Sequence, residues 1–153
     1  MSPQERLNQL GLALPPAPAP VGAYVPYVRV GNLVFTSGQL PMRDGKLMAT
    51  GKVGEDLSID QATEAARVAV LNAVAQVAGA AGGIDKIRRI VRLGVFVNSA
   101  AGFTDQPKVA NGASNLMADI FAEAGKHARS AVGSNELPLN AAVEIEMIAE
   151  VED

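Results

Sequence analysis

Cysteine and tryptophan are absent from this chain of 153 residues, and histidine occurs once, as His127. Without cysteine the chain has no disulfide, no thiolate metal site and no cysteine nucleophile. A single histidine also argues against a histidine-based metal centre and against a Ser-His-Asp triad. These absences exclude thiol chemistry, and we expect no metal site.

Positive charge and aromatic rings are scarce as well. Lys and Arg total 13 against 16 Asp and Glu, the formal net charge is −3, and aromatic residues make up 4%. A weakly acidic chain is not drawn to nucleic acid or to an anionic membrane, and it has few rings to stack on bases. The basic residues Lys86, Arg88, Arg89, Arg92 and Lys126 lack interleaved aromatics and are interpreted as solvated charge. We therefore expect no nucleic-acid partner.

No long hydrophobic run is present. A membrane helix needs roughly 18 uninterrupted apolar residues, and the closest segment, 65–82, is interrupted by Arg67, Asn72 and Gln76. Residues 1–11 carry charged and amide side chains instead of the apolar core of a secretory signal. We expect a soluble cytoplasmic protein with no membrane partner. Its 48% hydrophobic content is ample for one core.

The N-terminal residues 1–20 are predicted to be an extension of the domain. Residues 2–12 fit a short amphipathic helix with Pro3 in its first turn. Four prolines within residues 15–20 then favour an extended strap, because proline fixes φ and removes N–H donors. The remainder, residues 21–153, is predicted to form a single domain.

Hydrophobic periodicity predicts the elements of this domain. The predicted strands are 24–30, 33–38, 87–98, 128–133 and 141–151, with a minor strand at 47–48, and the predicted helices are 59–81 and 107–124. Pro26 indicates that the first strand lies at an edge or starts late. Ser58 is the expected cap of the longer helix, and Gly82 is its expected end.

The resulting order, β-β-(β)-α-β-α-β-β, predicts an α+β fold with a mixed sheet and both helices on one face. The chain has no further helix for the other face. An oligomer that buries this face between subunits is therefore expected.

Three places hold residues suited to chemistry, and the first two are a glycine and an arginine. Gly38 follows a predicted strand, where it either lets backbone N–H groups approach a ligand or only permits a bend. Arg129 shares a strand face with the small residues Ala131 and Gly133. Its guanidinium suits a small carboxylate, and the alternative is an ordinary surface or ion-pair arginine.

The third place is the pair Glu144 and Glu146, which point to the same side of the last strand. One of these carboxylates could orient or deprotonate a water molecule, and the alternative is a solvated strand face. The lone His127 lies near a predicted helix end, which is more typical of a capping or surface residue than of a catalyst.

These features occur in the order found in one family, and the sequence resembles the RidA/YjgF family of reactive-intermediate deaminases over residues 21–151. The segments that carry the resemblance are GAYV (22–25), VFTSGQLP (34–41), VFVN (95–98), ARSAV (128–132), ELP (136–138) and VEIEMIA (143–149). Each segment is weak alone, and their combination is specific.

The resemblance implies a chorismate-mutase-like fold and a homotrimer with a central barrel and three clefts between neighbouring subunits. It implies hydrolysis of 2-imino and 2-enamino acids to 2-keto acids and ammonia, without a cofactor. In this interpretation Arg129 grips the substrate carboxylate and Glu144 places the attacking water. The residues implied to bind substrate or line the cleft are Tyr24, from a neighbouring subunit, Ser37, Gly38, Asn111 and Ala131.

The sequence also departs from the family pattern. Ala23 stands where a proline is frequent, Ala131 replaces a residue that is often Cys, Thr or Ser, and residues 102–114 form a longer stretch. With the N-terminal extension, these traits indicate a divergent subgroup. Two other functions stay open: a non-catalytic trimer that binds or senses a small carboxylate, and, less favoured, an endoribonuclease. The acidic balance and the lack of a basic aromatic groove speak against the ribonuclease.

Overall fold

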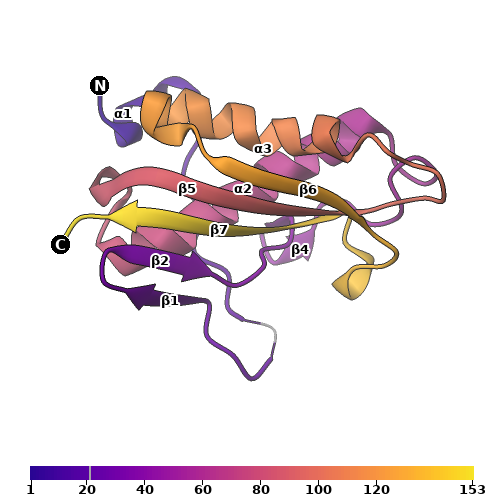
Figure 1. Ribbon diagram of the computed structural model, residues 1–153, viewed down its shortest axis with the longest axis horizontal. Helices are drawn as coiled ribbons and strands as arrows, with labels where there is room; N and C mark the ends of the chain where they lie inside the picture. The colour runs from indigo at the N-terminus through magenta and orange to yellow at the C-terminus, as the bar shows by residue number, and fades with distance from the viewer. Residues whose placement is uncertain (21) are drawn as a thin grey trace.

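The computed structural model describes residues 1–20 and 22–153. Its main feature is a five-stranded sheet (Figure 1). The strands in spatial order are β1 (Tyr27–Val30), β2 (Leu33–Thr36), β7 (Val143–Val151), β5 (Ile87–Asn98) and β6 (Ala128–Ser134). The pair β5 and β6 runs parallel and the other neighbours run antiparallel, so the sheet is mixed, as predicted.

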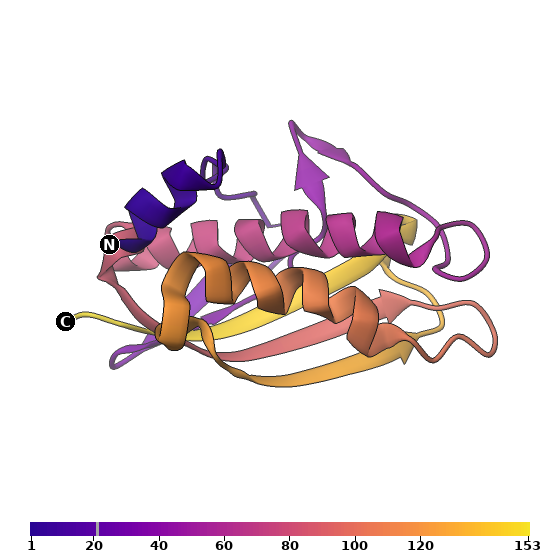
Figure 2. The same cartoon turned by 90° about the horizontal axis from the view of Figure 1, so that it is seen from above.

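Two long helices, α2 (Ile59–Ala81) and α3 (Gln106–Phe121), cover one face of this sheet. Figure 2 shows both helices, together with the short α1 (Pro3–Gln9), on the same side of the strands, and the opposite face bare. The small hairpin of β3 (Met42–Arg43) and β4 (Lys46–Leu47) projects on the helix side. The predicted α+β class and layer order are confirmed.

The predicted strands differ from the structure mainly at their ends. β1 begins at Tyr27 instead of residue 24, since Pro26 cannot donate to the ladder, and it lies at the sheet edge. β2 ends at Thr36, although Gln39 makes one further bridge to Ile145. β7 begins at residue 143 instead of 141. The minor strand predicted at 47–48 is the second arm of the β3–β4 hairpin.

The long helix α2 has the predicted bounds because both of its ends are encoded locally. The Ser58 hydroxyl accepts from the Gln61 amide at 3.1 Å, and Gln61 Oε1 accepts from the Ser58 amide at 2.9 Å. At the other end Gly82 adopts φ 91°, which an L side chain rarely takes. The second helix was predicted as 107–124. Its α-helical part ends at Phe121 because Ala122 has φ 54°, and a 3-10 turn, η2 (Ala122–Gly125), follows.

Close helix packing fixes where α3 lies. A Cβ at Gly112 would collide with the main-chain carbonyl of Thr63 in α2, so only glycine allows the helices to approach this closely. Gly125 packs in the same way on the carbonyl of Met117. The first contact holds α3 against α2, and the second holds the turn η2 against α3.

The N-terminal segment is attached to the core. The α1 helix ends at Gln9, earlier than predicted, and its Leu7 side chain is fully buried. The following strap is held where Gln76 Nε2 donates to the Pro18 carbonyl at 2.6 Å. The boundary at residue 20 stays a prediction. Within the described residues no helix is long and apolar enough to cross a membrane.

Candidate functional site

Alternation along β7 separates the two glutamates from the core. The odd-numbered residues from 143 to 151 are buried toward the helices, whereas Glu144 and Glu146 lie on the bare face. Their neighbours across the strand pair are Phe96 and Gly94 of β5. The side on which the glutamates lie was correctly predicted from the period of two.

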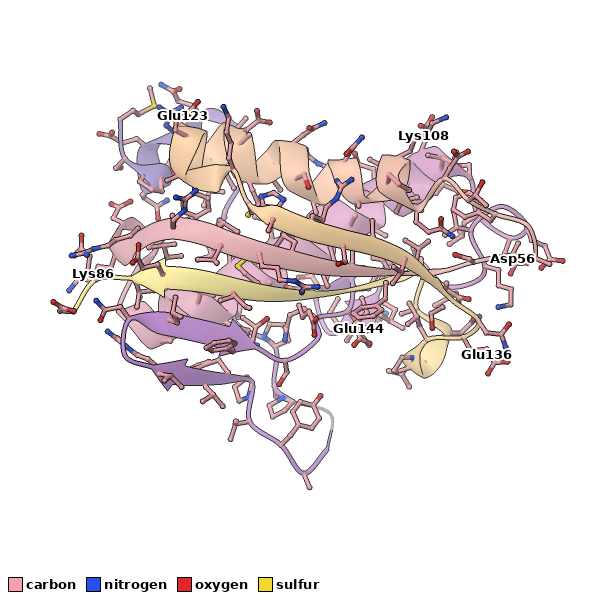
Figure 3. All side chains as sticks on the ribbon, in the orientation of Figure 1. Asp56, Lys86, Lys108, Glu123, Glu136 and Glu144 are labelled. Atoms are coloured by element: carbon pink, nitrogen blue, oxygen red, sulfur yellow. The ribbon has the colours of Figure 1, made fainter. Side chains whose placement is uncertain are left out.

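Gly38 is in direct contact with the Glu144 carboxylate. A Cβ at position 38 would overlap this carboxylate, so the glycine provides the space that the carboxylate fills. Gly38 does not have a positive φ, so a bend that only glycine permits is not the reason for it. Figure 3 labels Glu144 near the start of β7. Burial, and secondarily the charge of Glu146, raises the pKa of the Glu144 carboxyl above its ordinary value.

A cavity of about 1250 Å³ opens beside this carboxylate. Four of the predicted site residues line it: Tyr24, Ser37, Gly38 and Glu144. The Ser37 hydroxyl donates to the Val25 carbonyl at 2.6 Å, which ties the segment around Tyr24 to the end of β2. One chain therefore brings these four residues together, whereas the resemblance implies Tyr24 from a neighbouring subunit, and their roles stay predictions.

Arg129 lies on the other side of the sheet. It pairs with Leu93, whose side chain is buried toward the helices, so Arg129 points to the same side. Its Nη1 donates to Asn111 Oδ1 at 2.9 Å and to Ser114 Oγ at 3.1 Å, both on α3. Within residues 1–20 and 22–153 no carboxylate lies within 4.0 Å of this guanidinium. Among the described residues Arg129 therefore has no ion-pair partner.

Two other predicted site residues, Asn111 and Ala131, lie beside Arg129. Asn111 accepts one of its hydrogen bonds. Ala131 is the next residue on the same strand face and is partly buried against the core. Arg129, Asn111 and Ala131 do not line the cavity beside Glu144.

Two further polar residues belong to this second group: Ser114, which sequence reasoning missed, and His127, which it did not place near Arg129. Ser114 Oγ lies 2.9 Å from His127 Nε2, and His127 Nδ1 lies 2.6 Å from the Gly125 carbonyl oxygen. His127 is half-buried, and its contact with the last carbonyl of η2 agrees with the predicted capping role. The available signal was spacing: Ser114 follows Asn111 by three residues, which places both on one side of a helix.

The predicted site is consequently divided into two halves. The half with Glu144 lies on the bare face and its cavity, and the half with Arg129 lies on the helix face of edge strand β6. A single chain does not bring Arg129 and Glu144 to one small substrate. No cluster of three His, Asp or Glu side chains that could hold a metal ion occurs in the part of the chain that the structure describes.

Comparison with known proteins identifies the family to which this fold belongs. The family model described as "YjgF/chorismate_mutase-like, putative endoribonuclease" matches residues 4–151. The chain belongs to this YjgF/RidA family and has its chorismate-mutase-like α+β fold.

The relatives that resemble this chain indicate that it belongs to a divergent branch of the family. Protein TCP17 of Trypanosoma cruzi is 45% identical over 95% of this chain and 91% of its own length. The crystal structure of protein Atu1372 of Agrobacterium tumefaciens, described as of unknown function, is 46% identical over 98% of this chain and 92% of its own, with a TM-score of 0.91. The 2-iminobutanoate/2-iminopropanoate deaminase of Dermatophagoides farinae is 34% identical over 92% of this chain and 95% of its own.

Proposed function

We propose that this protein is a homotrimer that hydrolyses 2-imino and 2-enamino acids to 2-keto acids and ammonia at clefts between neighbouring subunits. The main support is the state of Arg129. Its guanidinium is anchored by two neutral oxygens and has no carboxylate partner among the described residues. An anchored but uncompensated guanidinium suits a carboxylate ligand.

The bare sheet face supports the assembly. It carries exposed apolar side chains from β1, β2 and β6: Val28, Val30, Leu33, Phe35 and Val132. Such a patch favours coverage by another protein surface, and a second copy is the occupant that this family makes plausible. A neighbouring subunit whose β6 edge reaches the cavity brings its own Arg129 close to Glu144.

The two halves then have complementary roles. Arg129 holds the substrate carboxylate, which orients the electrophilic C2 of the imine. Glu144 takes a proton from a water molecule as the water oxygen bonds to C2, and the proton passes to the nitrogen. The product is a carbinolamine. Its C–N bond breaks as the C2 hydroxyl proton is transferred to the nitrogen, which releases ammonia and leaves the 2-keto acid. A 2-enamino acid enters the same sequence after a proton moves to C3.

The raised pKa of Glu144 suits this role, since a carboxylate with a higher pKa is a stronger proton acceptor. The Dermatophagoides farinae relative is named as a 2-iminobutanoate/2-iminopropanoate deaminase, which supports hydrolysis of imino acids as the reaction class. A similar deaminase name belongs to a Salmonella typhimurium relative that is 35% identical over 87% of this chain and 91% of its own length.

The test is release of ammonia and keto acid from freshly generated 2-aminoacrylate and from a bulkier imino acid. Arg129→Ala is expected to lower kcat/KM at least about a hundredfold, some 2.7 kcal/mol of transition-state stabilisation. Arg89→Ala is the matched control, because Arg89 is an exposed arginine of β5 whose Nη2 donates to the Lys126 carbonyl.

No acceleration over buffer by folded wild-type protein would overturn deamination of these substrates. If a keto acid still bound and required Arg129, the result would favour the non-catalytic carboxylate-binding trimer.

A further inference from the structure

We propose that Ser114 and His127 are positioning residues that orient Arg129 for carboxylate binding; this rests on the carboxylate role of Arg129 in the proposed function. A continuous chain of contacts supports the idea. It runs from the Gly125 carbonyl through His127 and Ser114 to Arg129 Nη1, with separations of 2.6, 2.9 and 3.1 Å. No step in the chain is longer than an ordinary hydrogen bond.

With a neutral imidazole ring, the chemistry of these groups fixes the direction of each hydrogen bond. A carbonyl oxygen only accepts, so His127 Nδ1 must carry the proton toward Gly125. In the neutral ring Nε2 is then an acceptor, and the Ser114 hydroxyl donates to it. The lone pairs of Ser114 Oγ remain to accept from Arg129.

His127 thereby prevents a competing arrangement of the serine. A serine hydroxyl inside a helix often donates to the carbonyl four residues earlier, which here belongs to Ala110. With its proton directed to His127, the Ser114 oxygen stays oriented toward the guanidinium. The anchor itself is rigid, since Gly125 is packed on the Met117 carbonyl.

The contacts of Nη1 leave one edge of the Arg129 guanidinium free for a ligand. Nη1 has two hydrogens, and Asn111 Oδ1 and Ser114 Oγ supply an acceptor for each. Nε and Nη2 form the opposite edge, and neither donates to another residue in the parts of the chain that the structure describes. Two parallel N–H groups on one edge match the two oxygens of a carboxylate. Ser114 and His127 therefore act on substrate through Arg129.

Matched substitutions separate this role from a purely structural one. Ser114→Ala removes the acceptor for Nη1, whereas Ser114→Thr retains a hydroxyl. His127→Phe keeps a ring of similar shape without nitrogen, whereas His127→Gln retains an acceptor for the serine proton. The Ala and Phe variants are expected to raise KM about tenfold with kcat changed less than about threefold, and the Thr and Gln variants to stay near wild type.

The decisive measurement is calorimetric binding of 2-oxobutanoate, a non-reactive keto acid, to the full-length assembled protein. Dissociation constants about tenfold higher for Ser114→Ala and His127→Phe, with wild-type affinity in Ser114→Thr and His127→Gln, would support the proposal. Equal binding by all four variants, or equal losses within each pair, would overturn it. The proposed function fails separately if Arg129→Ala binds 2-oxobutanoate as well as wild type. If one pair fails to fold, the other pair still gives the comparison.

The cavity beside Glu144 is large enough to accept a long substrate side chain, and this is independent of the support of Arg129. We infer that the preferred 2-imino acids carry an apolar side chain longer than that of 2-iminobutanoate; this too rests on the proposed function. The cavity of about 1250 Å³ is larger than typical small-ligand pockets of about 300–1000 Å³. From Glu144 it extends between the proline strap, α2 and the β3–β4 hairpin.

The walls of this extension are mostly apolar. The strap contributes Leu12, Leu14 and prolines, and α2 contributes Val68 and Leu71. A substrate whose reacting carbon lies at Glu144 can therefore place an apolar chain along these walls. Burial of each additional methylene is worth about a three- to fourfold gain in binding.

The test uses 2-imino acids generated from 2-aminobutanoate, norleucine and phenylalanine. We expect kcat/KM to rise at least about tenfold from the shortest to the longest aliphatic substrate, and Leu71→Gln to reduce this preference. Leu10→Gln is the control, because Leu10 is exposed and does not line the cavity. Equal or better turnover of the shortest substrate would overturn this inference, whereas no turnover of any substrate would count against the proposed function.

Discussion

Gly38 and Glu144 are in direct contact, and the glutamate carboxylate fills the space that a Cβ at position 38 would occupy. Gly38→Ala is therefore expected to displace this carboxylate. We expect kcat/KM for imine hydrolysis to fall about ten- to a hundredfold. The melting temperature should change little, because the collision involves the end of a flexible side chain.

Gly94→Ala provides a control on the same sheet face. A Cβ there would come within 2.6 Å of Glu146 Oε1 and so displaces the neighbouring glutamate instead. Activity assays and thermal unfolding of both variants separate the two effects. Equal activity losses in the two variants would show that crowding of the face, and not the position of Glu144, determines the rate.

The charge of Glu146 gives a second prediction, on pH dependence. Glu146 raises the pKa of the Glu144 carboxyl, second to burial. Glu146→Gln should therefore move the acidic limb of the pH–rate profile to lower pH. It should not bring the pKa of Glu144 fully back to 4.5, because burial remains. An unchanged acidic limb would mean that another group controls it.

The same shift predicts how stability depends on pH. The pKa of Glu144 is higher in the folded chain than in the unfolded chain, so the folded chain binds this proton more tightly. The stabilisation is fully present below about pH 4.5 and is lost as pH rises through the folded pKa. Denaturant unfolding of wild type and Glu144→Gln across this window should show wild type losing stability relative to the variant as pH rises.

Two helical glycines provide a fourth prediction, on packing. A Cβ at Gly112 would collide with the Thr63 carbonyl, which is main chain and cannot rotate away. Gly112→Ala should lower the free energy of unfolding by about 1–3 kcal/mol. Gly79 in α2 has open space around its Cβ position, so Gly79→Ala should raise it by about 0.5–1 kcal/mol. Urea unfolding measures both, and equal changes would contradict the packing explanation.

The sequence predicted those elements whose ends and faces are encoded locally. The alternation in β7 gave the side on which Glu144 lies, and Ser58 and Gly82 gave both ends of α2. It did not predict why Gly38 is a glycine, because the reason is a contact with Glu144, 106 positions later in the chain. The support of Arg129 by Ser114 and His127 was missed for the same reason, since it depends on how α3 lies over β6.

The opposite placement of Arg129 and Glu144 gives the last prediction, on mixed assemblies. If each cleft takes Arg129 from one subunit and Glu144 from its neighbour, then Arg129→Ala and Glu144→Gln subunits can complement each other. Refolded together in equal amounts, they should recover about a quarter of wild-type activity, because one of four equally frequent ordered neighbour pairs has both groups intact. Each variant refolded alone should stay inactive.

The measurement is ammonia release from the co-refolded mixture, with a mixture of separately refolded variants as its control. Lack of recovery in a mixture shown by mass spectrometry to contain both subunits would place both groups in one chain's site. The sheet register argues against that outcome, because Arg129 pairs beside Leu93 on the helix side while Glu144 pairs beside Phe96 on the bare side.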